Sequence, residues 1–291
     1  MRLFKSQLTA LVAATALTAG LVASAAGTAA ASVPDQLRAG TVPQPAHTVV
    51  VMMENHSYSE IIGSSSAPYI NSLATGGALF TNSFGTTHPS EPNYLAIFSG
   101  STHSLTSDSC PHTYTTQNLG SELITTGLTF KGYSESMPSN GYTGCTSGAY
   151  ARKHNPWVNF TSNVPAASNL TFSSFPTSFS SLPTVSFVIP NLNDDMHDGT
   201  IAAGDTWLKN NIGAYATWAK ANNSLLVVTW DEDDSSQSNQ IPTIFYGGPV
   251  KTGSYSEKVT HYGVLRTIEQ AYGLPYVGSS ATATPITDAW Q

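Results

Sequence analysis

Short apolar runs, each ending at an acidic or turn-forming residue, are the clearest pattern along the chain. Their residues are apolar almost throughout instead of alternating with polar ones. The runs comprise residues 47–53, 184–189, 225–230 and 242–246, with weaker examples at 78–84 and 128–133. Continuous apolar character is typical of strands that are covered on both faces. The pattern therefore predicts a mostly parallel sheet.

Helical patterns lie between these runs. Residues 207–222 carry apolar side chains every three or four positions and directly precede a strand run. Residues 261–272 do the same and are followed by Gly273, a common helix stop. Strands that alternate with helices predict a three-layer α/β/α fold around the sheet. Residues 161–181 are rich in Ser, Thr, Phe and Pro without periodicity, so we expect a loop insertion over the sheet edge.

The first residues have the pattern of a secretory signal peptide. Arg2 and Lys5 precede an Ala- and Leu-rich apolar run, and small residues follow it. A membrane anchor is the alternative, but Thr and Gly interrupt the run, which is short for a span. We expect residues 1–31 to be cleaved and residues 32–291 to form a single secreted, extracellular domain. No later stretch is long and apolar enough to cross a bilayer, so we expect no stable membrane anchor.

Composition excludes some classes of protein. Only 10% of the residues are charged, against roughly 25% in an average domain, yet 40% are hydrophobic, which is enough for a core. The formal net charge of −7 leaves no basic surface for duplex nucleic acid. In an oxidising compartment the two cysteines, Cys110 and Cys145, are expected to form a disulfide.

Polar side chains follow several of the predicted strands directly. Glu54 and Asn55 follow the first run, residues 191–199 follow another, and Asp231 and Glu232 follow a third. Ligands of open α/β sheets gather outside the carboxyl ends of strands. Carboxylate and amide oxygens there suit a divalent cation. The alternatives are a helix-capping turn at Glu54 and exposed acidic loops elsewhere.

Ser90 is the strongest candidate nucleophile. It is expected at an N-cap, with Pro92 in the first helical turn, and a helix N-terminus favours an anion or a phosphorylated serine. Simple capping is the alternative. His261 opens the last helix, and residues 152–154 (RKH) are the only local concentration of positive charge. These ingredients predict cation-assisted attack of a hydroxyl on an anionic ester.

Several motifs, in a specific order, carry a resemblance to a known family. They are VVVMMENH, THPSEPNYLAIFSG, YSESMP, YARKHNP, IPNLNDDMHDGT, VVTWDED and THYG, and they span nearly the whole chain after residue 47. The sequence resembles the secreted acid phosphatase and phospholipase C family of phosphoesterases, a branch of the alkaline phosphatase superfamily. It is most similar to the fungal-type and mycobacterial secreted acid phosphatases. The resemblance implies an alkaline-phosphatase-like fold.

The resemblance also implies a role for each matching residue. Glu54 and Asn55 match one pair of metal ligands, Asp231 and Glu232 match the other, and Ser90 matches the nucleophile. The general acid is expected to be His197 or His261. The expected substrate-binding residues are Asn93, Arg152, His154 and Asp198.

The implied activity is hydrolysis of phosphate monoesters through a phosphoserine, with phosphoinositides such as phosphatidylinositol 3-phosphate among the substrates. Two-zinc relatives carry Asp-His where this chain carries Asp231 and Glu232, so Mg, Ca or Mn is expected in preference to Zn. A metal-independent enzyme is the alternative. Rival functions are a phospholipase C-type diesterase and a non-enzymatic cell-wall or sugar-binding protein. A lipase-type esterase requires a Gly-x-Ser-x-Gly motif, which the chain lacks.

Overall fold

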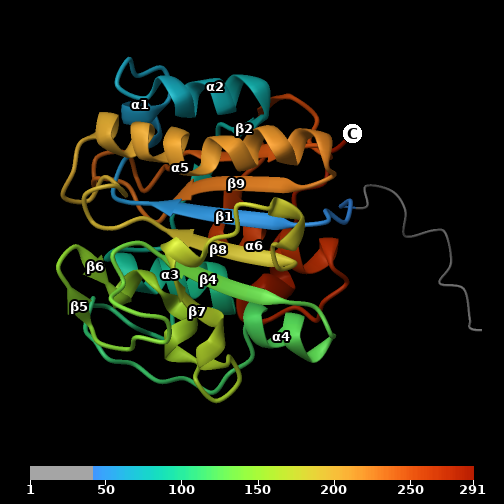
Figure 1. Ribbon diagram of the computed structural model, residues 1–291. Coiled ribbons are helices and arrows are strands. Elements are labelled where there is room, and N and C mark those ends of the chain that lie inside the picture. The colour runs from blue at the N-terminus through green and yellow to red at the C-terminus, as the bar shows by residue number, and fades with distance from the viewer. Residues whose placement is uncertain (1–41) are drawn as a thin grey trace, which may run out of the picture. The chain divides into compact units, whose positions relative to one another are not determined.

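An eight-stranded sheet forms the centre of the computed structural model, which describes residues 42–291 (Figure 1). Its strand order is β11-β2-β10-β9-β1-β8-β4-β7. The strands are β1 (Thr48–Met53), β2 (Ala78–Phe80), β4 (Phe130–Ser134), β7 (Asn169–Thr171), β8 (Val185–Ile189), β9 (Leu225–Trp230), β10 (Thr243–Gly247) and β11 (Gly253–Tyr255). Two small ladders pair β3 (Ser83–Phe84) with β12 (Val259–Thr260) and β5 (Thr146–Ser147) with β6 (Tyr150–Ala151).

The sheet is mostly parallel, as predicted. The neighbours β9, β1, β8, β4 and β7 all run in one direction, and β10 alone among the described strands of this sheet runs antiparallel to its neighbours. Val50 in the middle of β1 lies opposite Phe187 of β8 and Val227 of β9. All three residues are fully buried, which explains why these strands are continuously apolar in sequence.

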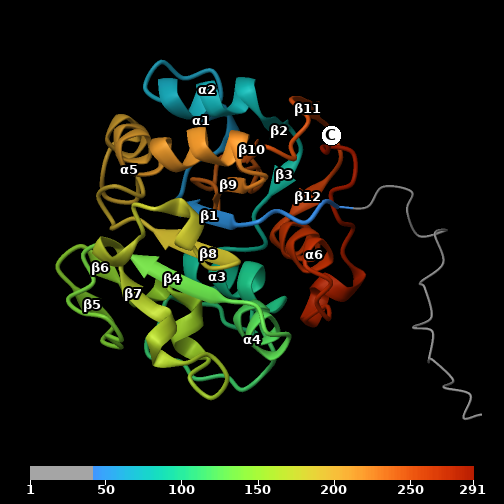
Figure 2. The same cartoon turned by 45° about the vertical axis from the view of Figure 1, so that its right-hand side comes forward.

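Helices cover both faces of the sheet (Figure 2). Their bounds are α1 (Tyr58–Ile61), α2 (Pro68–Gly76), α3 (Ser90–Ser99), α4 (Leu119–Thr125), α5 (Ile201–Ala221) and α6 (His261–Ala271). Short 3-10 helices are η2 (Arg152–His154), η3 (Pro156–Asn159), η4 (Ala166–Ser168), η5 (Phe172–Ser174), η6 (Phe179–Ser181) and η7 (Gly278–Thr282). The helix expected at 207–222 begins six residues earlier, where Thr200 caps it.

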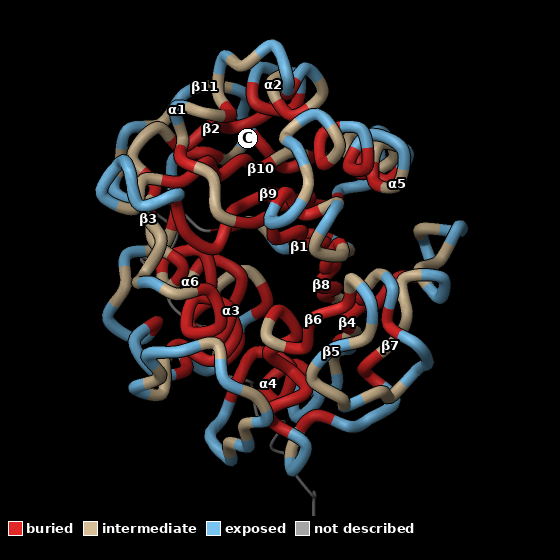
Figure 3. Tube along the Cα trace, turned by 90° about the vertical axis from the view of Figure 1, so that its left-hand side faces the viewer, coloured by how far each residue is buried: buried red, intermediate tan, exposed pale blue. Residues whose placement is uncertain are grey.

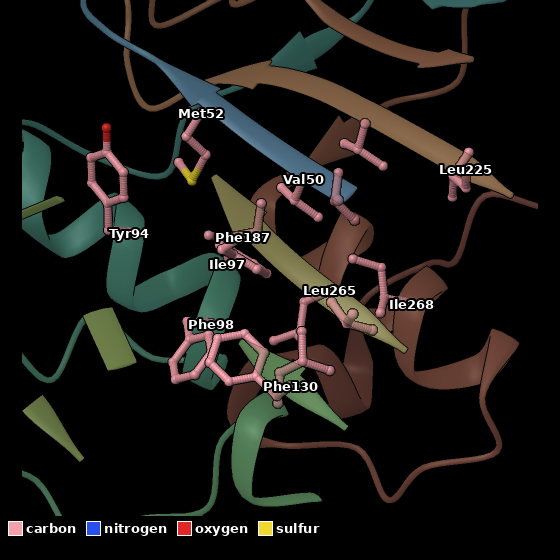
Figure 4. Packing of buried hydrophobic residues seen from close by; sticks show 14 of the residues in the cluster. Val50, Met52, Tyr94, Ile97, Phe98, Phe130, Phe187, Leu225, Leu265 and Ile268 are labelled. Atoms are coloured by element: carbon pink, nitrogen blue, oxygen red, sulfur yellow. The ribbon is translucent and has the colours of Figure 1, made fainter. Parts of the chain in front are cut away.

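Alternate residues of β1 point into two separate cores. Val50 and Met52 pack with α3 and α6, as Figure 4 shows, and residues of α4 belong to the same core. Val49 and Val51 pack on the other face with α1, α2 and α5. The central strands β1, β8 and β9 and helix α3 are among the most deeply buried parts of the described residues (Figure 3). All ten residues of α3 are buried, so this helix is held rigidly against the sheet.

Two sequence expectations need correction. The run 78–84 is two strands, β2 and β3, because the chain turns away after Phe80 and pairs with different partners. Residues 161–181 are not a plain loop, because they contain 3-10 turns and contribute β7 to the sheet edge beside β4.

Cys110 and Cys145 form the expected disulfide, with an S–S distance of 2.06 Å. None of the helices in residues 42–291 combines the length and apolar composition that a membrane span requires. The predicted signal peptide, residues 1–31, lies outside the described residues.

Candidate active site

The carboxyl ends of β1 and β9 meet the N-terminus of α3 at one edge of the sheet. Met53 of β1 lies opposite Trp230 of β9, so the residues that follow them, Glu54 and Asp231, are neighbours. Ser90 begins α3, and all three side chains are buried. Parallel pairing therefore brings together residues that are far apart in sequence.

Ser90 contacts two carboxylates. Its Oγ lies 3.1 Å from Glu54 Oε2 and 3.1 Å from Glu232 Oε1, so its single proton can be donated to either carboxylate. Asn55 Nδ2 donates to Glu232 Oε1 at 2.8 Å, and the Asn55 backbone N–H donates to Asp231 Oδ1 at 3.1 Å. Asn55 has a φ of 48°, a conformation that asparagine tolerates well. The five residues expected to be nucleophile and metal ligands thus form one cluster.

A second group of side chains meets the other side of Glu54. Glu54 Oε1 lies 3.1 Å from His154 Nε2, and His154 Nδ1 lies 3.3 Å from Asp195 Oδ2. The Tyr94 hydroxyl donates to Glu54 Oε1, and the Tyr94 ring stacks on His154 with centroids 4.8 Å apart. In Figure 4 this hydroxyl points away from the core residues. Sequence reasoning missed Asp195 and Tyr94, although Asp195 lies within the acidic run that follows β8.

The buried carboxylates repel one another. Burial, followed by the charges of Asp231 and Asp195, raises the pKa of Glu54 well above its ordinary value. Burial and Glu232 do the same for the pKa of Asp231, and burial raises the pKa of Asp195 to about 7. A buried carboxyl group with a raised pKa becomes stable as an anion when a positive charge lies close to it.

The cluster also holds buried oxygen atoms without hydrogen-bond partners. They are Asn55 Oδ1 and Asp231 Oδ2. A buried acceptor without a partner is unfavourable. The chemistry of this donor set fits a divalent cation. A geometric triad of Glu54, His154 and Asp195, with donor atoms within 4.8 Å of one another, is also a possible metal site.

Two partly exposed histidines lie at the rim. His88 Nδ1 is 2.5 Å from Glu232 Oε2, and its Nε2 is 3.3 Å from Asp233 Oδ1. Sequence reasoning did not single out His88, although it lies two residues before Ser90. His197 Nδ1 is 2.7 Å from Asp198 Oδ1, and the His197 ring centroid is 6.3 Å from that of His154.

Comparisons with known proteins identify the family of the chain. The model of the phosphoesterase family matches residues 64–275. The chain belongs to the phosphoesterase family. It is therefore a hydrolase that acts on phosphate esters. The expected resemblance is confirmed.

This phosphoesterase is similar in sequence to named phosphatases. It is 57% identical over 257 residues to a phosphatidylinositol-3-phosphatase of Mycobacterium tuberculosis, covering 87% of this chain and 86% of that protein. It is 30% identical to an acid phosphatase of Aspergillus fumigatus, with coverage of 78% and 55%. The chain thus spans little more than half of the fungal enzyme.

Solved structures confirm the fold of the phosphoesterase. A protein in the alkaline phosphatase superfamily from Vibrio parahaemolyticus matches with a TM-score of 0.60 at 12% identity, covering 85% of this chain and 72% of that one. The lipoteichoic acid synthase LtaP from Listeria monocytogenes matches with a TM-score of 0.56 at 11% identity, covering 89% and 79%.

The side chains of three expected site residues of the phosphoesterase are engaged in contacts inside the protein. His261 is fully buried, with Nε2 at 2.9 Å from Trp230 O and Nδ1 at 3.2 Å from Thr86 Oγ1. Burial lowers its pKa to about 4. Both ring nitrogens are therefore engaged, and the ring links β9 to the loop before Ser90. The role of His261 as general acid stays a prediction.

Arg152 and Asn93 are likewise engaged inside the protein. The Arg152 guanidinium donates to Thr143 O, His112 O and Asn159 Oδ1, and so ties these segments together. The Asn93 side chain makes four hydrogen bonds to the backbone of residues 86–89 and is fully buried. Ser90 is the first residue of α3, not its N-cap, which is Pro89.

Proposed function

We propose that this chain is a phosphomonoesterase of the acid phosphatase type, and that Ser90 is its nucleophile. The observation that carries the proposal is the contact of Ser90 Oγ with two buried carboxylates at the N-terminus of α3. The carboxylates of Glu54 and Glu232 are placed to accept the hydroxyl proton, which makes the oxygen a stronger nucleophile. The helix N-terminus favours the phosphate charge.

A divalent cation would be held by Glu54, Asn55, Asp231 and Glu232. These are oxygen ligands, and two of them, Asn55 Oδ1 and Asp231 Oδ2, have no hydrogen-bond partner. Such a set fits Mg, Ca or Mn better than Zn, which prefers nitrogen and sulfur ligands. When bound, such an ion neutralises phosphate charge and lowers the pKa of a nearby hydroxyl. Glu54 also belongs to the triad with His154 and Asp195, so removal of the Glu54 carboxylate should abolish metal binding in either arrangement.

The chain's own residues account for the remaining steps. Ser90 Oγ attacks phosphorus and its proton passes to a carboxylate, which leaves a phosphoserine and an alkoxide leaving group. His197, oriented by Asp198, protonates that leaving oxygen from the rim, and water then hydrolyses the phosphoserine.

The substrates are proposed to be small phosphate monoesters and phosphoinositides, including phosphatidylinositol 3-phosphate. The name of the mycobacterial relative and its 57% identity support the lipid substrate. A phospholipase C-type diesterase would use the same nucleophile and a pocket that admits two ester groups.

A substrate panel separates these functions. Rates are measured on p-nitrophenyl phosphate, bis-p-nitrophenyl phosphate, phosphatidylinositol 3-phosphate and phosphatidylcholine, each with and without chelator. We expect hydrolysis of the two monoesters, little hydrolysis of the diesters, and loss of activity with chelator that Mg, Mn or Ca restores. Faster hydrolysis of the diesters would favour the phospholipase C-type function, and full activity after exhaustive chelation would contradict the proposed cation.

Secretion is proposed from the sequence of residues 1–31, with residues 32–291 as one phosphoesterase domain. Mass spectrometry of the protein from the culture medium should find an N-terminus near residue 32. An intact N-terminus on cell-associated protein would contradict this.

A further inference from the structure

The N-terminus of α3 has few free amide groups. A helix leaves its first four N–H groups without partners inside the helix. Here two of the four positions, Pro89 and Pro92, have no N–H at all. Only the amides of Ser90 and Glu91 remain beside the nucleophile, and the Glu91 amide donates to Asp108 Oδ1 at 2.9 Å.

The same Asp108 carboxylate also binds a lysine. Lys153 Nζ donates to Asp108 Oδ2 at 2.9 Å. One carboxylate thus joins an ammonium group to the helix end that carries Ser90. An ammonium has three N–H groups, so this contact leaves Lys153 able to donate to a further anion.

Lys153 also lies next to the carboxylate cluster. Its neighbour in sequence, His154, contacts Glu54 at 3.1 Å. The positive charge of Lys153 lowers the pKa of Glu54 and Asp195 against the larger effect of burial. Arg152, on its other side, directs its two terminal nitrogens at backbone and side-chain oxygens, and its Nε is buried. Of the three basic residues in this segment, Lys153 is the one with donors to spare and some exposure, 18% of its side chain.

The segments that carry Asp108 and Lys153 are fastened to each other. Cys110, two residues after Asp108, is bonded to Cys145, whose carbonyl accepts from the backbone N–H of Arg152 at 2.9 Å. The Arg152 guanidinium bonds Thr143 O and His112 O, one on each segment. The Asp108–Lys153 pair is therefore built on a braced pair of loops instead of on two free surface side chains.

We propose that Lys153 binds the phosphate group of the ester beside Ser90, and that Asp108 is a positioning residue that holds the Lys153 ammonium at the N-terminus of α3. This inference rests on the proposed phosphatase function. An ordinary exposed ion pair, which contributes little to stability and nothing to substrate binding, is the competing explanation.

Steady-state kinetics on p-nitrophenyl phosphate test the proposal, with inorganic phosphate as competitive inhibitor. The variants are Lys153→Met, Lys153→Arg, Asp108→Asn and the double variant Lys153→Met/Asp108→Asn. Lys209→Met is the control, because Lys209 is an exposed residue of α5. We expect Lys153→Met to raise KM and the phosphate Ki by roughly tenfold or more, with a smaller change in kcat. Lys153→Arg should keep part of the affinity, and Lys209→Met should match the wild type.

Asp108→Asn should raise KM and Ki by less than Lys153→Met, and should add nothing in the double variant, because Asp108 acts through Lys153. Unchanged KM and Ki with a lowered melting temperature would overturn the proposal in favour of a structural ion pair. A lower KM in Asp108→Asn would also overturn it, because Asp108 would then compete with phosphate.

Calorimetric titration of inorganic phosphate into Ser90→Ala separates this inference from the proposed function. Weaker phosphate binding in Ser90→Ala/Lys153→Met than in Ser90→Ala supports the lysine assignment even if turnover is not by Ser90. Equal binding refutes it even if the wild type is an active phosphatase.

Discussion

Asn93 offers the sharpest contrast between what its sequence motif implies and what its contacts imply. The motif suggests a substrate-binding residue. In the structure its Oδ1 accepts from the amides of Thr86 and Thr87 at 2.9 and 3.0 Å, and its Nδ2 donates to Thr87 O and Pro89 O at 2.8 and 3.1 Å. The side chain is fully buried. We therefore expect Asn93→Ala to loosen the loop that leads into Ser90.

The magnitude follows from the hydrogen bonds that are lost. Each contributes about 0.5–1.5 kcal/mol net, so four give about 2–6 kcal/mol. Thr86 and Thr87 are only partly buried, so water can replace some of the lost bonds. We expect Asn93→Ala to lower the free energy of unfolding by about 2–4 kcal/mol. Because Ser90 loses its alignment, kcat should fall more than KM rises.

Urea unfolding followed by circular dichroism measures the first effect, and kinetics on p-nitrophenyl phosphate measures the second. Asn210→Ala is the control, since Asn210 is exposed on α5, and its free energy of unfolding should stay within about 0.5 kcal/mol of the wild type. If Asn93→Ala is as stable as the wild type and only KM rises, Asn93 binds substrate and the scaffold role is wrong.

Three further changes test the packing and electrostatics. Burial raises the pKa of Glu269 from 4.5 to about 7. As the pH rises, Glu269 loses its proton in the unfolded state before it does so in the folded state. The free energy of unfolding should therefore fall by up to about 3 kcal/mol between pH 4.5 and about 7. Glu269→Gln should flatten this slope in urea unfolding between pH 5 and 8, and an unchanged slope would refute the assignment. Gly132→Ala would place a Cβ 2.2 Å from the Trp157 ring and should destabilise by about 1–3 kcal/mol; an unchanged melting temperature would contradict that packing. The Cys110–Cys145 bond joins residues 35 positions apart. By the chain-entropy relation, its reduction should lower the free energy of unfolding by about 4 kcal/mol. Equal urea midpoints for the oxidised and reduced protein would contradict this stabilisation.

The sheet could be predicted because its signal is local. Runs such as 225–230 are apolar at all but one position, and burial between two helical layers is what permits that composition. β7 could not be found in this way. Asn169–Thr171 has no strand pattern of its own, and it becomes a strand by pairing with Gly132–Ser134 of β4.

The candidate site was predictable where chain position alone decides it. Glu54 and Asp231 follow neighbouring strands directly, so their proximity follows from parallel pairing. The direction in which a side chain points cannot be predicted from chain position alone. Arg152 and His261 are basic or titratable residues next to the site, yet they point into the protein and bond to backbone oxygens.

Tyr94 and Asp195 were missed for the same reason, because the direction of each side chain depends on tertiary packing. Tyr94 is an apolar-looking position on α3 in sequence, and only the packing of α3 on the sheet turns its hydroxyl to Glu54. Asp195 was one of several acids in a row, and its selection depends on the approach of His154 from η2.

Trapping the covalent intermediate tests the nucleophile most directly. The enzyme is mixed with a ³²P-labelled phosphate monoester, quenched in acid within milliseconds, digested and mapped by mass spectrometry. The label should be found on Ser90, and Ser90→Ala should keep its circular dichroism spectrum while losing both label and turnover. Label on another residue such as Thr87, or turnover by Ser90→Ala, would contradict the account.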